Sequence, residues 1–122
     1  MRVFKNSWFS RFARREKITD EVLIDAISRA MQGLIDADLG GGVIKRRVAR
    51  PGQGRSGGYR TIIIFKQNEK AFFMYGFAKS KQENIEKYEE ETFKKAAKEL
   101  LALTDDQLDQ LLKSQGLVEV NL

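Results

Sequence analysis

The sequence contains neither cysteine nor histidine in its 122 residues. Without cysteine, the chain can form no disulfide bond and no thiolate metal site. Without histidine, it lacks the commonest general acid–base side chain and the commonest zinc ligand. Any catalysis must therefore use lysine, arginine, tyrosine, carboxylate or hydroxyl side chains, and we expect neither a metal nor a small-molecule cofactor.

Long apolar runs are also missing. No stretch approaches the roughly 20 apolar residues that are needed to span a bilayer. The first twelve residues, MRVFKNSWFSRF, lack the uninterrupted apolar core of a signal peptide. The sequence therefore predicts a soluble, cytoplasmic protein with no membrane partner.

Charge is distributed unevenly along this basic chain, whose net charge is +5. Residues 1–18 carry six basic side chains and one acidic one, and residues 43–66 carry seven basic side chains and no acidic one. Residues 104–122 reverse the balance, with four acids and one lysine. Clustered like charges repel one another, so this asymmetry favours a specific anionic partner such as RNA.

Residue patterns predict alternating helices and strands. The strands are expected at residues 2–6, 43–49, 59–66, 71–78 and 117–120, and the three from 43 to 78 form an antiparallel meander. Helices are expected from Thr19 to about Leu34, from 83 to 103, and from Thr104 to Gly116. Gly40, Gly41 and Gly42 are expected to stop the first of these helices.

These elements predict an α+β fold. We expect a small antiparallel β-sheet, made of the N-terminal strand and the three-stranded meander, packed against N-terminal helices and a C-terminal helix. Residues 1–103 would form the main domain, and residues 104–122 would be an appended helical tail.

A glycine-rich loop joins two strands of the meander. Its segment Gly52–Gly57, GQGRSG, has the letters of a dinucleotide-binding fingerprint, but that fingerprint requires a following helix, and a strand is predicted here. A hairpin loop is the simpler interpretation, since glycine tolerates positive φ. The same glycines would let backbone N–H groups approach a phosphate while Arg50 and Arg55 supply charge.

Strand alternation sorts the basic residues onto two faces. Ile44 and Val48 make one face of the 43–49 strand the better core set, which leaves Lys45 and Arg47 on an open face. Arg46 would then lie at an edge or extend its charged end to water. Arg60 shares the face of Lys45 and Arg47 only if the strand register permits.

Other candidate residues flank the meander. Lys79 and Lys81 follow its last strand and can approach the same face, although lysines at such boundaries are commonly only solvated. Among the three tyrosines, Tyr59 is the best candidate for stacking on a base or donating a proton, because it adjoins the glycines and Arg60. Trp8 is expected in the core or at a protein interface.

The order of elements, with the segments KRRVARPGQGRSGGYR and FFMYGFAKSK, resembles the RelE/HigB superfamily of bacterial toxins. The resemblance covers about residues 1–103 and implies an mRNA endoribonuclease that acts in the ribosomal A site. It also implies a cognate antitoxin, typically a helix-turn-helix protein. The family's catalytic basic residues would fall on Lys45, Arg47, Arg60, Lys79 and Lys81.

The implied chemistry is metal-independent cleavage through the RNA 2′-OH. Lys45 is the candidate base, since neighbouring cations favour its neutral form. Arg47 and Arg60 would stabilise the phosphate. The proton donor stays open between Lys79, Lys81 and Tyr59, because Ser80 and Glu86 stand where the family's RelE branch has arginine and tyrosine.

Two other classes of function remain open. A non-catalytic nucleic-acid- or ribosome-binding domain would share the basic face and would bind in a salt-dependent way without cleaving RNA. A pure interaction protein would use the same face to receive an acidic partner helix and would not associate with ribosomes.

Overall fold

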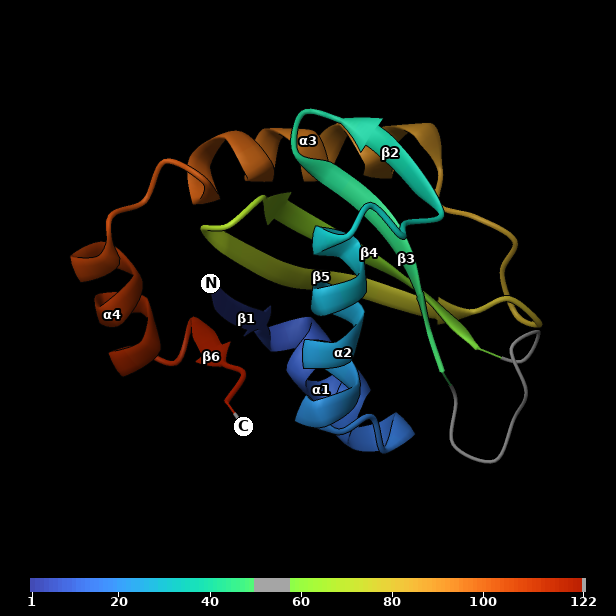
Figure 1. The fold of residues 1–122 in the computed structure, drawn as a ribbon, viewed down its shortest axis with the longest axis horizontal. Helices are drawn as coiled ribbons and strands as arrows, with labels where there is room; N and C mark the ends of the chain where they lie inside the picture. Colours follow the sequence, from blue (N-terminus) through green and yellow to red (C-terminus); the bar gives the residue numbers. More distant parts are fainter. Residues whose placement is uncertain (50–57, 122) are drawn as a thin grey trace.

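The computed structural model describes residues 1–49 and 58–121. These residues form four helices and six strands. In chain order they are β1 (Arg2–Asn6), α1 (Ser7–Glu16), α2 (Asp20–Met31), β2 (Ala37–Gly40), β3 (Val43–Val48), β4 (Tyr59–Lys66), β5 (Lys70–Ala78), α3 (Lys87–Leu100), α4 (Asp105–Lys113) and β6 (Leu117–Glu119) (Figure 1).

All six strands belong to one sheet with the order β2-β3-β4-β5-β1-β6. Every neighbouring pair is antiparallel except β1 and β5, which are parallel. The predicted α+β class and the antiparallel meander β3-β4-β5 are confirmed. The sheet is larger than predicted, because β2 extends it at one edge and β6 at the other.

Helices cover both faces of the sheet. One core cluster joins α1 and α2 to one face and includes Phe9, Leu23 and Ile63. The second cluster joins α3 and α4 to the other face and includes Ala97 and Leu108. The expectation of an open sheet face is therefore wrong, since the strands are apolar enough on both sides to bury helices.

The α2 helix ends earlier than predicted. Thr19 is its N-cap, as expected, and accepts a hydrogen bond from the Val22 N–H. The helix stops at Met31, and Gly33 follows with a φ of +83°. Leu34, which the apolar pattern placed in the helix, lies after it and is 50% exposed.

The glycines at 40–42 turn a hairpin and do not end a helix. They connect β2 to β3, and all three have positive φ. Gly42 also lies against α3, since an added Cβ would come within 2.7 Å of the Leu101 Cδ1. Sequence reasoning missed β2 because ADLG has too little apolar or β-branched character to predict a strand.

The α3 helix is shorter than predicted. It begins at Lys87, where Glu86 and Glu89 form a reciprocal capping box. Tyr88 in its first turn is 71% exposed, whereas Phe93 and Ala96 pack against the core.

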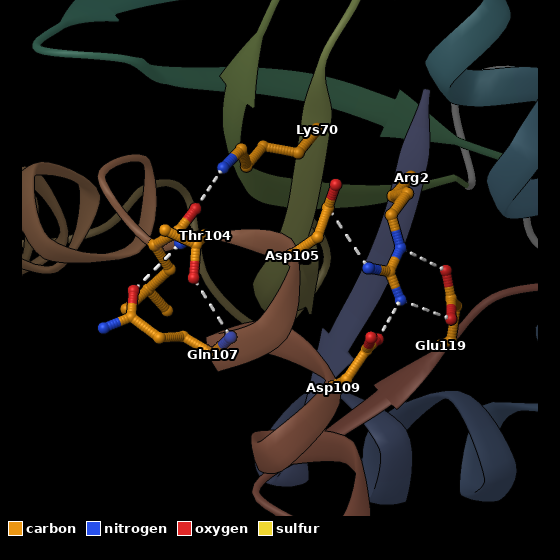
Figure 2. A network of polar contacts seen from close by, with 8 residues as sticks. Arg2, Lys70, Thr104, Asp105, Gln107, Asp109 and Glu119 are labelled. Atoms are coloured by element: carbon orange, nitrogen blue, oxygen red, sulfur yellow. Dashed lines mark hydrogen bonds and ion pairs between the residues drawn. The ribbon is translucent and has the colours of Figure 1, made fainter.

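Residues 104–121 attach to the N-terminal strand. Thr104 and Gln107 form the predicted capping box of α4, and β6 pairs with β1. Arg2 of β1 donates hydrogen bonds to Glu119, Asp109 and Asp105, and Figure 2 shows these carboxylates around its guanidinium. These hydrogen bonds, above all the one that Arg2 donates to Glu119, raise the pKa of Arg2.

None of the helices that the structure describes is both long enough and apolar enough to cross a membrane.

Candidate functional site

Strand register brings the predicted basic residues into two neighbouring rows across the sheet. In one row Arg47 of β3 lies opposite Arg60 of β4, and Arg60 lies opposite Phe77 of β5. Lys45 begins the next row on the same face, opposite Ile62, which pairs with Tyr75. We call Lys45, Arg47 and Arg60 the cationic row residues.

The register was the open question about Arg60. Directly opposed residues have Cβ atoms about 4.5–5.5 Å apart, so Arg47 and Arg60 place two positive charges side by side. Neither β3 nor β4 contains an acidic residue. The structure thus brings the three cations onto one face, as the residue alternation required.

Arg60 is the most unusual of the three. Arg60 is only 9% exposed, and its Nη1 is buried with no hydrogen-bond partner among the described residues. A buried donor without an acceptor costs about 1–3 kcal/mol, and a charged one costs more. Such a cation can bind an anionic acceptor.

Lys45 and Arg47 are half-buried, and Arg46 lies on the opposite face. The backbone C=O of Arg46 accepts a hydrogen bond of 2.6 Å from the Thr61 hydroxyl, which fixes β3 to β4 beside the cationic row residues. Ile44 and Val48 are buried on the Arg46 face, as predicted.

Tyr59 does not join the cationic row residues. It lies in the core cluster of α1 and α2, is 2% exposed, and packs edge-on against Phe12. Its hydroxyl donates a 2.6 Å hydrogen bond to the Glu16 carboxylate. Because adjacent residues of a strand face opposite sides, the proximity of Tyr59 to Arg60 in sequence separates their side chains in space.

Tyr75 is the tyrosine that the register places near the cations, and sequence reasoning ranked it below Tyr59. Its ring lies 4.5 Å from Trp8 and 6.0 Å from Phe77, measured between centroids. Its hydroxyl donates to Gln82 at 3.2 Å. Register shifts between Ile62 and Ile63, where β5 contains one extra residue, so simple alternation does not reveal this placement.

Trp8 is partly exposed and lies between two rings. Its ring stacks on Phe12 at 5.1 Å and lies tilted against Tyr75 at 4.5 Å, measured between ring centroids. It therefore joins α1 to β5 and is a packing residue in the described structure, in keeping with the predicted core or interface role.

The remaining predicted residues lie at the end of the meander. Lys79 and Lys81 are exposed in the turn that follows β5, just beyond the Arg47–Arg60–Phe77 row. Arg50 and Arg55 fall outside the described residues, as does the GQGRSG segment. The chain continues from that segment into strand β4, so the helix that a dinucleotide fingerprint requires does not follow it.

The chemistry available here is that of cations. Within residues 1–49 and 58–121, no group of three acidic side chains is placed to hold a metal ion. Closely spaced arginine and lysine side chains bind phosphate oxygens and stabilise charge that develops on them.

Comparison with known proteins identifies the family of this chain. A search of curated proteins finds no significant match. The family model described as "RelE toxin of RelE / RelB toxin-antitoxin system" matches residues 1–120, which is nearly the whole chain. With its α+β sheet and its cationic row residues, this chain belongs to the RelE family of toxin–antitoxin toxins.

Proposed function

We propose that this chain is an mRNA endoribonuclease that cuts RNA on the ribosome, arrests translation, and is neutralised by a cognate helix-turn-helix antitoxin. Membership of the RelE family supports the general class, toxin of a toxin–antitoxin pair. The observation that carries the catalytic proposal is Arg60, a nearly buried cation opposite Arg47 whose Nη1 has no acceptor among the described residues. Ribosomes place this activity in the cytoplasm.

The proposed reaction uses the RNA 2′-OH as its nucleophile. Lys45 accepts the 2′-OH proton, and the 2′-oxygen attacks the adjacent phosphorus. Arg47 and Arg60 stabilise the negative charge that grows on the phosphate oxygens. The bond from phosphorus to the 5′-oxygen breaks, and that oxygen takes a proton from Lys79 or Lys81. The products are a 2′,3′-cyclic phosphate and a free 5′-hydroxyl.

A translating extract tests this proposal. The wild-type chain is expected to cut mRNA and stop protein synthesis, whereas the double variant Lys45→Ala/Arg60→Ala is expected to do neither. Thermal unfolding of the variant checks that it still folds. If the double variant still arrests translation, the assignment of Lys45 and Arg60 to the catalytic site is wrong.

A non-catalytic ribosome-binding domain is the second candidate, favoured by the burial of Arg60, which limits its contact with a reacting phosphate. It predicts salt-dependent ribosome binding with intact mRNA. Mapping mRNA 5′ ends in the same extract separates the two, because only a nuclease creates new ends.

A further inference from the structure

A hollow of about 680 Å³ lies between α2 and β3, and its lining includes Arg46 and the cationic row residue Arg47. The side chains of Val22 and Ala26 contribute apolar surface from α2, and Val48 contributes it from β3. Leu34 forms part of its rim and is 50% exposed, although it is a large apolar residue. We call this feature the α2–β3 hollow.

Charged groups of both signs also line the α2–β3 hollow. The Arg46 Nε is buried and has no hydrogen-bond partner among the described residues. Glu21 and Asp36 lie in the lining, and the described residues provide no ion-pair partner for either carboxylate. Arg29 and Asp25 pair with each other at 2.9 Å and are already satisfied.

This combination selects the kind of occupant. The Arg46 Nε–H needs an acceptor, which a carboxylate or a backbone carbonyl would provide. An apolar side chain of the occupant would cover Leu34 and the apolar lining, which removes apolar surface area from water and favours binding. The lining holds as many acidic side chains (Glu21, Asp25, Asp36) as basic ones (Arg29, Arg46, Arg47), so the hollow offers a polyanion no net attraction.

We propose that the α2–β3 hollow is the docking site for a segment of the antitoxin that inserts one large apolar side chain and carries a charge of each sign beside it. The proposal rests on the proposed neutralisation by an antitoxin. Arg47 also lines the hollow, so a segment that binds there would lie next to the cationic row residues.

Binding of the protein encoded by the adjacent open reading frame tests the proposal. Leu34→Asp places a charge on the apolar rim, and Arg46→Met keeps most of the side-chain volume while removing the charge. Each is expected to weaken binding, measured by calorimetry, about tenfold or more. Val118→Asp makes the same apolar-to-acidic change at a 40% exposed position of β6 and is expected to change affinity less than twofold.

Translation arrest without the antitoxin provides the second readout. Both variants are expected to arrest a translating extract as the wild type does, because neither residue belongs to the cationic row residues. Wild-type affinity in both Leu34→Asp and Arg46→Met would overturn the proposal. Loss of ribosome binding in Arg46→Met, with antitoxin affinity unchanged, would also overturn it and assign the hollow to RNA. A wild-type chain that binds the antitoxin but leaves mRNA intact would refute the nuclease and leave the docking result to stand on its own.

Discussion

At the scale of single residues, the pairing of Arg47 with Arg60 is expected to lower the stability of the fold. Two like charges directly opposite each other destabilise a sheet, and a buried charge without a partner costs several kcal/mol. No acidic residue of β3 or β4 offsets this cost. The burial of Arg60 in such surroundings supports its proposed role in binding phosphate.

Arg60→Met tests whether Arg60 lowers the stability of the fold and supports RNA cleavage. Because methionine fills a similar volume without charge, we expect the variant to unfold at the same or a higher denaturant concentration. We expect RNA cleavage to fall about 10²–10³-fold, which is typical for loss of one charge-stabilising group. Arg46→Met, the same change on the opposite face of β3, serves as the control and should cleave normally. Cleavage by Arg60→Met at the wild-type rate would exclude Arg60 from the site.

Tyr59 is expected to serve stability alone. Tyr59→Phe removes the 2.6 Å hydrogen bond to Glu16, so we expect the free energy of unfolding to fall by about 1–3 kcal/mol with cleavage unchanged. Tyr88→Phe, at a 71% exposed position, should change the free energy by less than about 0.5 kcal/mol. Chemical denaturation measures both. If the Tyr59→Phe variant folds but no longer cleaves RNA, Tyr59 would again be a candidate proton donor.

At the scale of elements, the β2–β3 hairpin depends on where its glycines meet α3. Gly42 and Gly33 both have positive φ, so an alanine at either position costs about 1–2 kcal/mol in backbone strain. They differ in their surroundings, because an added Cβ at Gly42 meets the Leu101 Cδ1 at 2.7 Å, whereas at Gly33 it meets no atom within 4 Å.

Comparing the two alanine variants separates strain from contact with α3. We expect Gly42→Ala to lower the free energy of unfolding more than Gly33→Ala does. Adding Leu101→Ala to Gly42→Ala should cost less than the two single changes summed, since the second substitution removes the clash. Equal losses in Gly42→Ala and Gly33→Ala would mean that Leu101 moves aside without cost.

At the scale of the whole molecule, one side chain ties the two ends of the chain together. Arg2 near the N-terminus binds Glu119 of β6 and two aspartates of α4, which lie more than 100 residues away in sequence (Figure 2). Asp105 and Asp109 are largely exposed, whereas Glu119 is only 25% exposed in its side chain. Most of the stabilisation should therefore come from Glu119.

Arg2→Met is expected to lower the midpoint of thermal unfolding, and more strongly at low salt, because ions screen exposed pairs. The free energy of unfolding should fall by about 1 kcal/mol, with RNA cleavage unchanged. Arg29→Met breaks only the exposed pair with Asp25 and should have a smaller effect. An equal effect in the two variants would show that Arg2 is an ordinary surface residue.

Deleting residues 104–122 tests the division that the sequence suggests at residue 103. The deletion removes three buried side chains, Leu108, Leu117 and Val120, and each contributes about 1.5–3 kcal/mol. We expect the shortened chain to lose its cooperative thermal transition. A chain of residues 1–103 that keeps the transition would be an independent domain, and its translation arrest and antitoxin affinity would then define what the tail adds.

By itself, the sequence determined the α+β class, the meander and the helix N-caps at Thr19 and Thr104. It also determined that Lys45 and Arg47 share a face. These features depend on local patterns, namely alternation, capping residues and charge, which neighbouring residues impose on one another. The family resemblance rests on the same local segments.

Only the tertiary structure decided which distant residues meet. Strand register placed Arg60 opposite Arg47, and the extra residue in β5 brought Tyr75 to that face. Tyr59 is buried against Phe12 of α1, on the opposite face from Arg60. Register and helix packing depend on contacts between segments far apart in the chain, and a one-residue shift reverses which side chains share a face. The identity of the cations was thus readable from the sequence, while their arrangement side by side on one face required the fold.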